Sequence, residues 1–227
     1  EFGGGLFANG DVTVTGCLID SNTAITDAGG VFGNGALTTI LSSTVRFNQA
    51  ARSAGGVWAE NAARVENATF IANQAGATGG GLHSNGGNSV VVSSTFSANL
   101  VGNQVVDGTE RGGGAIHQSG GTLTVLDVAL SNNSSLSDGG GIAARAPVTI
   151  SGGSFFANIA GASGGGLYQE TFGPSSLTVT GTSWTENRAS TGGGIYTYAP
   201  LAISGAEFVS NTATSYGGAL FSNAAGV

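Results

Sequence analysis

The chain has no methionine and no lysine, only three prolines and one cysteine, and few charged residues. Six arginines are its only basic side chains, and its net charge is −7. Nucleic acids and anionic membrane surfaces both require a basic face, so neither is expected as a partner. No apolar run approaches the roughly 20 residues that a membrane-spanning helix needs, and we expect no direct membrane insertion.

Glycine, in contrast, makes up 42 of the 227 residues and recurs at regular intervals. With 40% hydrophobic residues the chain is too apolar to be disordered, and it lacks the proline content of collagen. The single cysteine, Cys17, occupies a position that other repeats fill with small residues such as Ser43 and Ala68. We therefore expect a buried free thiol that packs as a small hydrophobe.

Two short phrases alternate from one end of the sequence to the other. The first reads Gly-Gly-(Gly or Ala)-aliphatic, and its aliphatic residues are Leu6, Val31, Val57, Leu82, Ile116, Ile142, Leu167, Ile195 and Leu220. The second reads hydrophobic-x-x-Asn, and its asparagines are Asn22, Asn48, Asn73, Asn99, Asn133, Asn158, Asn187 and Asn211. Successive aliphatic residues are separated by 25, 26, 25, 34, 26, 25, 28 and 25 positions. A period in this range indicates a solenoid of stacked repeats.

Each repeat contains three short strand candidates, as at 6–8, at 12–15 and around Phe70. The second alternates β-branched and polar residues, which is typical of a strand. Strands this short are stable only when each pairs with its equivalent one repeat away. The sequence therefore predicts an all-β, right-handed parallel β-helix of about 8–9 coils with three parallel sheets, rising about 4.8 Å per coil.

The asparagines are predicted to form a structural ladder at a tight corner, where asparagine tolerates the left-handed conformation and bonds its equivalents in adjacent coils. The recurring glycines are predicted to permit corner geometry that a Cβ would obstruct. No helix pattern follows them, so they carry no nucleotide-binding signal.

A second column follows the aliphatic residue and is aromatic or histidine in eight of nine repeats. Its members are Phe7, Phe32, Trp58, His83, His117, Tyr168, Tyr196 and Phe221, with Ala143 as the exception. Strand alternation turns this column away from the core, so it forms a candidate interaction stripe for another chain or a sugar. The alternative is that each ring lies along a corner beneath its own loop. Both interpretations are kept, and the two neighbouring histidines alone predict no metal site.

Insertions at 100–111 and 169–176 interrupt the period, and solenoids commonly carry added function in such segments. The densest charged cluster, Asp107, Glu110 and Arg111, lies in the first insertion and is predicted to be a solvated loop rather than a catalytic site. We expect no catalytic residues, no metal and no cofactor.

Two further patterns concern the surface. An outward column of threonines similar to an ice-binding face is interrupted by Arg64, and its members are Thr13, Thr39, Thr124, Thr149 and Thr178. Asn67 and Asn132 begin Asn-x-Ser/Thr patterns and are candidate glycosylation sites, whereas Asn133 belongs to the inward ladder.

The paired phrases resemble the repeats of the polymorphic outer membrane proteins of chlamydial type. Matches include 113–116 and 217–220 for the first phrase, and 70–73, 96–99 and 208–211 for the second. The resemblance covers the whole chain, although most repeats have Gly in place of Ala and four replace Phe. It implies an exported, right-handed β-helix at a cell surface, acting as an adhesin or structural component.

These observations predict one β-helix domain over 1–227, a segment of a longer chain or of a stacked assembly. Its expected function is non-enzymatic: an extracellular structural or adhesive element of a cell-surface filament, sheath or adhesin stalk. Expected partners are copies of itself, other surface proteins or glycans. The alternatives are a polysaccharide-active β-helix enzyme, which would need carboxylates converging in one groove, and an ice-binding or glycan-binding β-helix.

Overall fold

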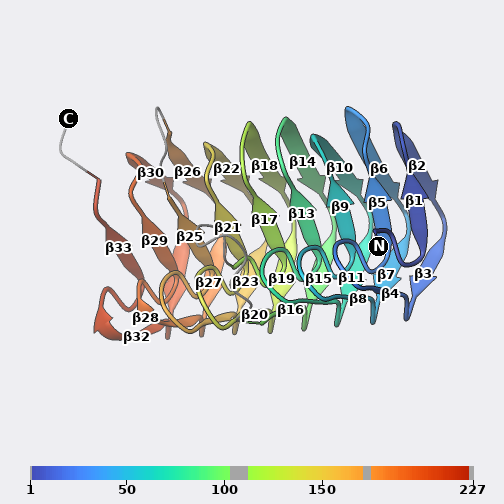
Figure 1. Ribbon diagram of the computed structural model, residues 1–227. Helices are drawn as coiled ribbons and strands as arrows, with labels where there is room; N and C mark the ends of the chain where they lie inside the picture. Colours follow the sequence, from blue (N-terminus) through green and yellow to red (C-terminus); the bar gives the residue numbers. More distant parts are fainter. Residues whose placement is uncertain (1, 103–111, 171–174, 225–227) are drawn as a thin grey trace.

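The computed structural model describes residues 2–102, 112–170 and 175–224, and within these it contains strands but no helix. The strands wind into a rod whose coils stack one on the next, with neighbouring strands parallel (Figure 1). The predicted all-β parallel β-helix is therefore confirmed.

Two sheets contain the strands that begin each coil. Sheet A comprises β1 (Leu6–Ala8), β5 (Val31–Gly33), β9 (Val57–Ala59), β13 (Leu82–Ser84), β17 (Ile116–Gln118), β21 (Ile142–Ala144), β25 (Leu167–Gln169), β29 (Ile195–Thr197) and β33 (Leu220–Ser222). Sheet B comprises β2 (Val12–Thr15), β6 (Leu37–Leu41), β10 (Ala62–Glu66), β14 (Asn88–Val92), β18 (Thr122–Leu126), β22 (Val148–Ser151), β26 (Leu177–Thr180) and β30 (Leu201–Ser204).

Two further sheets contain the strands on either side of the asparagine. Sheet C comprises β3 (Leu18–Asp20), β7 (Thr44–Arg46), β11 (Thr69–Ile71), β15 (Thr95–Ser97), β19 (Ala129–Ser131), β23 (Ser154–Phe156), β27 (Ser183–Thr185) and β31 (Glu207–Val209). Sheet D comprises β4 (Thr23–Ala24), β8 (Gln49–Ala50), β12 (Gln74–Ala75), β16 (Leu100–Val101), β20 (Ser134–Ser135), β24 (Ile159–Ala160), β28 (Arg188–Thr191) and β32 (Thr212–Tyr216).

The number of sheets is four, so the prediction of three is wrong. Sheet D is the additional one, and its strands follow directly after each asparagine. Most of them are only two residues long, as in β8 and β12. Two residues are too few to show an alternating pattern, and the sequence therefore gave no periodic signal for this sheet.

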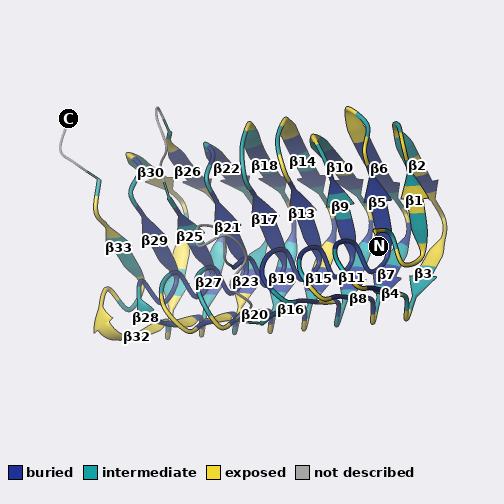
Figure 2. Cartoon of the chain, in the orientation of Figure 1, coloured by how far each residue is buried: buried dark blue, intermediate teal, exposed yellow. Residues whose placement is uncertain are grey.

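The pairing register confirms the repeat alignment. Leu6 pairs with Val31, Val14 with Ile40, and corresponding residues continue along each sheet. The inward residues form one apolar core that includes Val14 near one end and Ile195 near the other. Inside sheet C the rings stack on each other, Phe70 on Phe96 with centroids 4.4 Å apart. Figure 2 shows this core as continuous dark blue through the middle coils.

The corner next to each asparagine has the left-handed backbone that was predicted, but one residue earlier. The residues with positive φ include Ser21, Phe47, Ala72 and Ala98, each immediately before a ladder asparagine. A positive φ is energetically unfavourable for alanine and phenylalanine. The hydrogen bonds made by the asparagine that follows offset this cost. The asparagine itself is free to make those bonds from a strand-like backbone.

The thiol of Cys17 is exposed, so the prediction that it is buried is wrong. Its equivalents in the next coils, Ser43 and Ala68, are buried as expected. Cys17 differs in that it lies in the first coil of the described rod, at its end. Its Sγ lies 3.2 Å from the carbonyl oxygen of Thr15.

Candidate functional site

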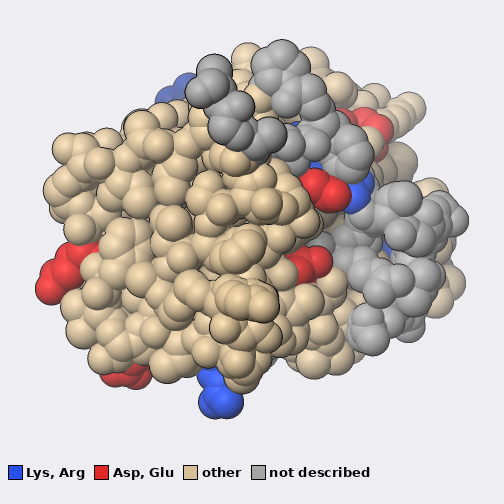
Figure 3. Space-filling model, turned by 90° about the vertical axis from the view of Figure 1, so that its left-hand side faces the viewer, with Lys and Arg blue, Asp and Glu red and all other residues tan. Residues whose placement is uncertain are grey.

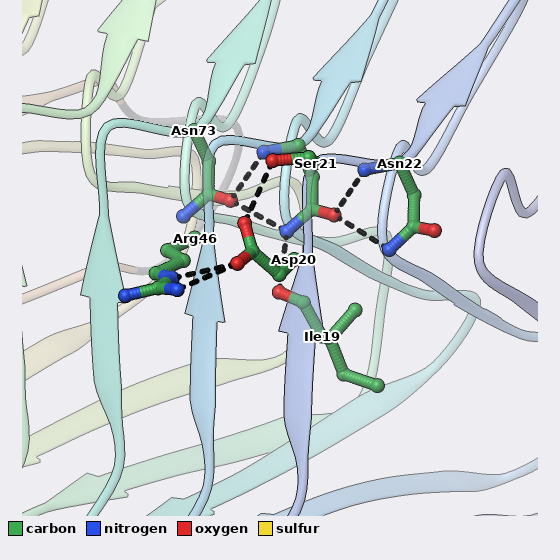
Figure 4. A network of polar contacts seen from close by, with 7 residues as sticks. Ile19, Asp20, Ser21, Asn22, Arg46 and Asn73 are labelled. Atoms are coloured by element: carbon green, nitrogen blue, oxygen red, sulfur yellow. Dashed lines mark hydrogen bonds and ion pairs between the residues drawn. The ribbon is translucent and has the colours of Figure 1, made fainter.

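The eight asparagines form the predicted ladder, and their side chains serve the fold. The backbone N–H and the Nδ2 of Asn48 both donate to Oδ1 of Asn73, at 3.1 and 2.9 Å. The other Nδ2 hydrogen of Asn48 goes to the carbonyl of Ile19 at 3.0 Å. Figure 4 shows the first steps of this ladder beside the Arg46–Asp20 ion pair. The fully buried members are Asn48, Asn73, Asn99, Asn133, Asn158 and Asn187.

The aromatic column forms two stacks along the outside of sheet A. In the first, the rings of Phe7, Phe32, Trp58, His83 and His117 follow each other with centroids 4.1–5.9 Å apart. Ala143 interrupts the column. The second stack then joins Tyr168 to Tyr196 at 5.4 Å and Tyr196 to Phe221 at 5.1 Å.

Most of this column is covered, which decides between the two sequence-based interpretations. Phe7 is 51% exposed, but Phe32, His83, His117 and Tyr196 are buried. The segment that leads from sheet D back to sheet A folds over the rings, so that Ala28 and Ala54 share a buried cluster with Phe32 and Trp58. A fully exposed interaction stripe is therefore wrong for the middle coils, where the stack forms a second, smaller core.

The two histidines are buried within this second core. Nδ1 of His83 lies 2.7 Å from the Thr78 hydroxyl, whereas neither ring nitrogen of His117 has a hydrogen-bond partner among the described residues. Burial lowers the pKa of His83 well below its ordinary value, with further lowering from His117 and Arg52. Burial also lowers the pKa of His117 to about 3, assisted by the positive charge of Arg145. Both side chains are therefore neutral at physiological pH.

Neutral buried histidines make the stability of the rod depend on pH. The unfolded chain protonates both below its ordinary pKa of 6.5, whereas the folded chain does so only at much lower pH. The stabilisation is thus complete above 6.5 and is lost as the pH falls towards the folded pKa. Between about pH 7 and about pH 5 each histidine is expected to reduce the free energy of unfolding by about 2 kcal/mol. Denaturant unfolding at the two pH values measures this loss.

The matched variant for this prediction is His117→Phe, because the same column accepts phenylalanine in other coils. We expect it to keep full stability at neutral pH, since it removes two unpaired buried nitrogens. It should also halve the loss of stability between neutral and acidic pH. An unchanged pH dependence in this variant would show that the histidines are not its origin.

Within the described ranges, three ion pairs join charged residues of adjacent coils: Arg46–Asp20, Arg52–Asp27 and Arg145–Glu170. Arg52 holds the buried carboxylate of Asp27, which also accepts the backbone N–H of Ser53 at 3.1 Å. Arg46 pairs with Asp20 at 2.6 Å and lowers the pKa of that carboxyl. In these contacts the opposite charges of successive repeats stabilise the register.

Among the described residues no group of three or more His, Cys, Asp or Glu side chains is placed to hold a metal ion. The cluster of Asp107, Glu110 and Arg111 lies outside the described residues, as does most of the two insertions. Within the described ranges, no helix is long and apolar enough to span a bilayer.

Both candidate glycosylation sites lie at exposed corners. Asn67 and Asn132 have positive φ values of 49° and 55° and point away from the core. Asn133 is fully buried in the ladder, as predicted. Asn67 and Asn132 are thus exposed, whereas the ladder residue Asn133 is not. The glycosylation of the two exposed asparagines stays a prediction.

One feature of the surface was not predicted. An open groove of about 400 Å³ follows the outside of sheet D across the first four coils. Its rim carries Thr23, Gln49 and Gln74, the residues directly after three ladder asparagines. The only indication of this groove in the sequence is the polar residue that follows each of these asparagines. A polar residue at that position does not predict a concave surface.

Comparison with known proteins yields no relative. No protein-family model matches the chain, and no match is found among curated proteins or solved structures.

Proposed function

We propose that this chain is a non-enzymatic, extracellular structural and adhesive β-helix, a building block of a cell-surface filament, sheath or adhesin stalk. The observation that carries the proposal is the continuity of four parallel sheets and one core along the described rod. A solenoid of this kind spans a distance with a constant cross-section, which suits a spacer or a filament subunit.

The contacts between coils support a mechanical role for the rod. The coil interfaces in the middle of the rod combine backbone bonds from four sheets with an asparagine step, and several also contain stacked rings. Separating two such coils requires these bonds to break together, because they are in parallel around one cross-section. Stacking at about 4.8 Å per coil gives a rod roughly 40 Å long.

The surface supports contact with neutral partners. Figure 3 views one end of the rod and shows few charged side chains, scattered among uncharged ones. Large apolar side chains along the flanks are also exposed, including Ile25, Leu136, Phe156 and Ile159. Exposed apolar groups of this size, on a surface with little charge, favour association with other macromolecules.

Electron microscopy and surface labelling of the native cells test this proposal. An antibody raised against the folded chain should label intact cells as strongly as permeabilised ones. Extracellular protease should remove that label while a cytoplasmic marker stays intact. Electron micrographs should show gold particles on filaments, sheaths or stalks. Labelling that requires permeabilisation, or that marks no surface structure, would contradict the proposal.

A further inference from the structure

The groove on sheet D is open and has the volume of a small-molecule site. Its volume of about 400 Å³ lies within the range of about 300–1,000 Å³ typical of small-molecule sites. Thr23, Gln49 and Gln74 form one rim and Ile25 and Ala51 belong to the opposite wall, while Gly102 lies at its far end. Because the rim residues come from successive coils, the groove runs along the rod rather than around it.

The glutamine side chains of this rim have no hydrogen-bond partner within the described ranges. The side-chain amides of Gln49 and Gln74 are both exposed. Some exposed amides elsewhere are engaged instead, since Asn34 bonds Asn9 at 2.9 Å and Asn85 bonds Glu60 at 3.1 Å. The two glutamines therefore offer free donors and acceptors one coil apart.

The backbone beneath the groove is closed to a peptide strand. The N–H groups of Gln49 and Gln74 donate to the carbonyls of Asn22 and Asn48 in the preceding coil. Those of Ala51 and Gly76 are likewise bonded to the coil before them. An extended peptide binds a sheet mainly through free backbone groups, and none of these four N–H groups is free.

Among the described residues, the lining of the groove contains no charged side chain. The nearby Arg52 is engaged by the buried Asp27. Phosphate and carboxylate ligands are recognised by arginine or lysine, so this lining does not match them. It offers instead free amides on one side and the apolar surfaces of Ile25 and Ala51 on the other.

We propose that this groove binds a neutral oligosaccharide, which lies along the rod with its hydroxyls on Gln49 and Gln74 and a C–H face against Ile25 and Ala51. Sugar hydroxyls both donate and accept, as do the amides, and a pyranose ring presents an apolar face. This inference deepens the proposed function, on which it rests for its biological setting, by naming the ligand of the adhesive surface.

Nuclear magnetic resonance of the ¹⁵N-labelled chain tests the inference. The probes are neutral hexasaccharides of glucose, mannose, xylose and N-acetylglucosamine at millimolar concentration, and an acidic oligogalacturonate as the charged comparison. We expect saturable shifts of the Gln49 and Gln74 side-chain amide signals with at least one neutral probe. The acidic probe should cause none.

Variants then locate the site. The double variant Gln49→Ala and Gln74→Ala should weaken binding by about tenfold or more, the effect of losing two hydrogen bonds. Ala51→Trp should block the groove outright. Asn88→Ala, an exposed amide on sheet B, is the matched control and should bind as the parent does. All of these residues are exposed, so thermal unfolding should change little and loss of binding would not reflect loss of fold.

Three results would overturn the inference: no shift with any neutral probe, shifts that the double variant leaves unchanged, or equal binding of oligogalacturonate. None of them bears on the surface labelling described above. Conversely, a chain that binds the sugars but is found only inside cells would overturn the proposed function and leave the site in place.

Discussion

Asn133→Ala is expected to lower the free energy of unfolding by about 3–6 kcal/mol, because it removes four hydrogen bonds from the interior of the rod. Oδ1 of Asn133 accepts both the backbone N–H and the Nδ2 of Asn99, at 3.0 and 2.9 Å. Its Nδ2 donates to the Phe96 carbonyl at 2.9 Å and to Oδ1 of Asn158 at 3.0 Å. All of these atoms are inside the rod, where water cannot replace the lost bonds. Urea unfolding followed by circular dichroism measures the change.

The control for this variant is Asn88→Ala, which removes an exposed asparagine from sheet B and should change stability by about 0.5 kcal/mol or less. Equal effects of the two substitutions would contradict a stabilising ladder.

Asn133→Asp provides a second comparison, since it keeps the shape but replaces the donor with a carboxylate oxygen facing the carbonyl of Phe96. Burial should raise the pKa of this carboxyl in the folded state. With a raised folded pKa, its contribution to stability is present at low pH and lost as the pH rises through that pKa. Relative to the parent, the variant should therefore recover stability on acidification.

Gly140→Ala is expected to cost at least about 3 kcal/mol and to prevent the coils on either side from stacking in register. A Cβ at this position would lie 2.5 Å from the carbonyl oxygens of Gly165 and Ile159 and from the carbonyl carbon of Ile159. All three atoms are backbone atoms of the next coil, so no side-chain rotation relieves the overlap. The loss should be visible as a lower unfolding temperature and as reduced amide protection in β20 and β24.

Gly86→Ala is the matched control, because a Cβ there meets no atom within 4 Å and the backbone needs no positive φ. It should be neutral or raise stability by up to about 1 kcal/mol through the lower entropy of the unfolded chain. If both alanines were equally well tolerated, close coil approach would not explain the recurring glycines.

The third glycine of the phrase also lies close to inward side chains. A Cβ at Gly166 would lie 2.8 Å from the ring of Trp184, and one at Gly81 would lie 3.0 Å from the ring of Phe96. The aliphatic side chains of Ile19 and Val45 come nearly as close to a Cβ at Gly30 and Gly56, at 3.1 and 3.2 Å. Close contact at this glycine is therefore not restricted to coils with an inward ring.

Much of the fold could be predicted from the sequence because the repeat determines the register. When residues such as Leu6 and Val31 occupy the same place in successive repeats, parallel pairing of equivalent strands buries all of them at once. A slip by one residue would turn the aliphatic residues outwards, so the repeat permits one arrangement. The asparagine ladder follows for the same reason. Every repeat has an asparagine at this position, so stacking the repeats in register places each asparagine next to those of the adjacent coils.

The sequence by itself thus determined the solenoid, its register, its inward columns and the structural role of the asparagines. Only the tertiary structure decided what lies outside the coil. Period-two alternation predicts that the side chains of Phe32 and His83 leave the core, but their cover comes from a segment without periodicity. The groove on sheet D is likewise visible only where residues of successive coils come together. Such arrangements arise from loop packing, which residue spacing does not encode.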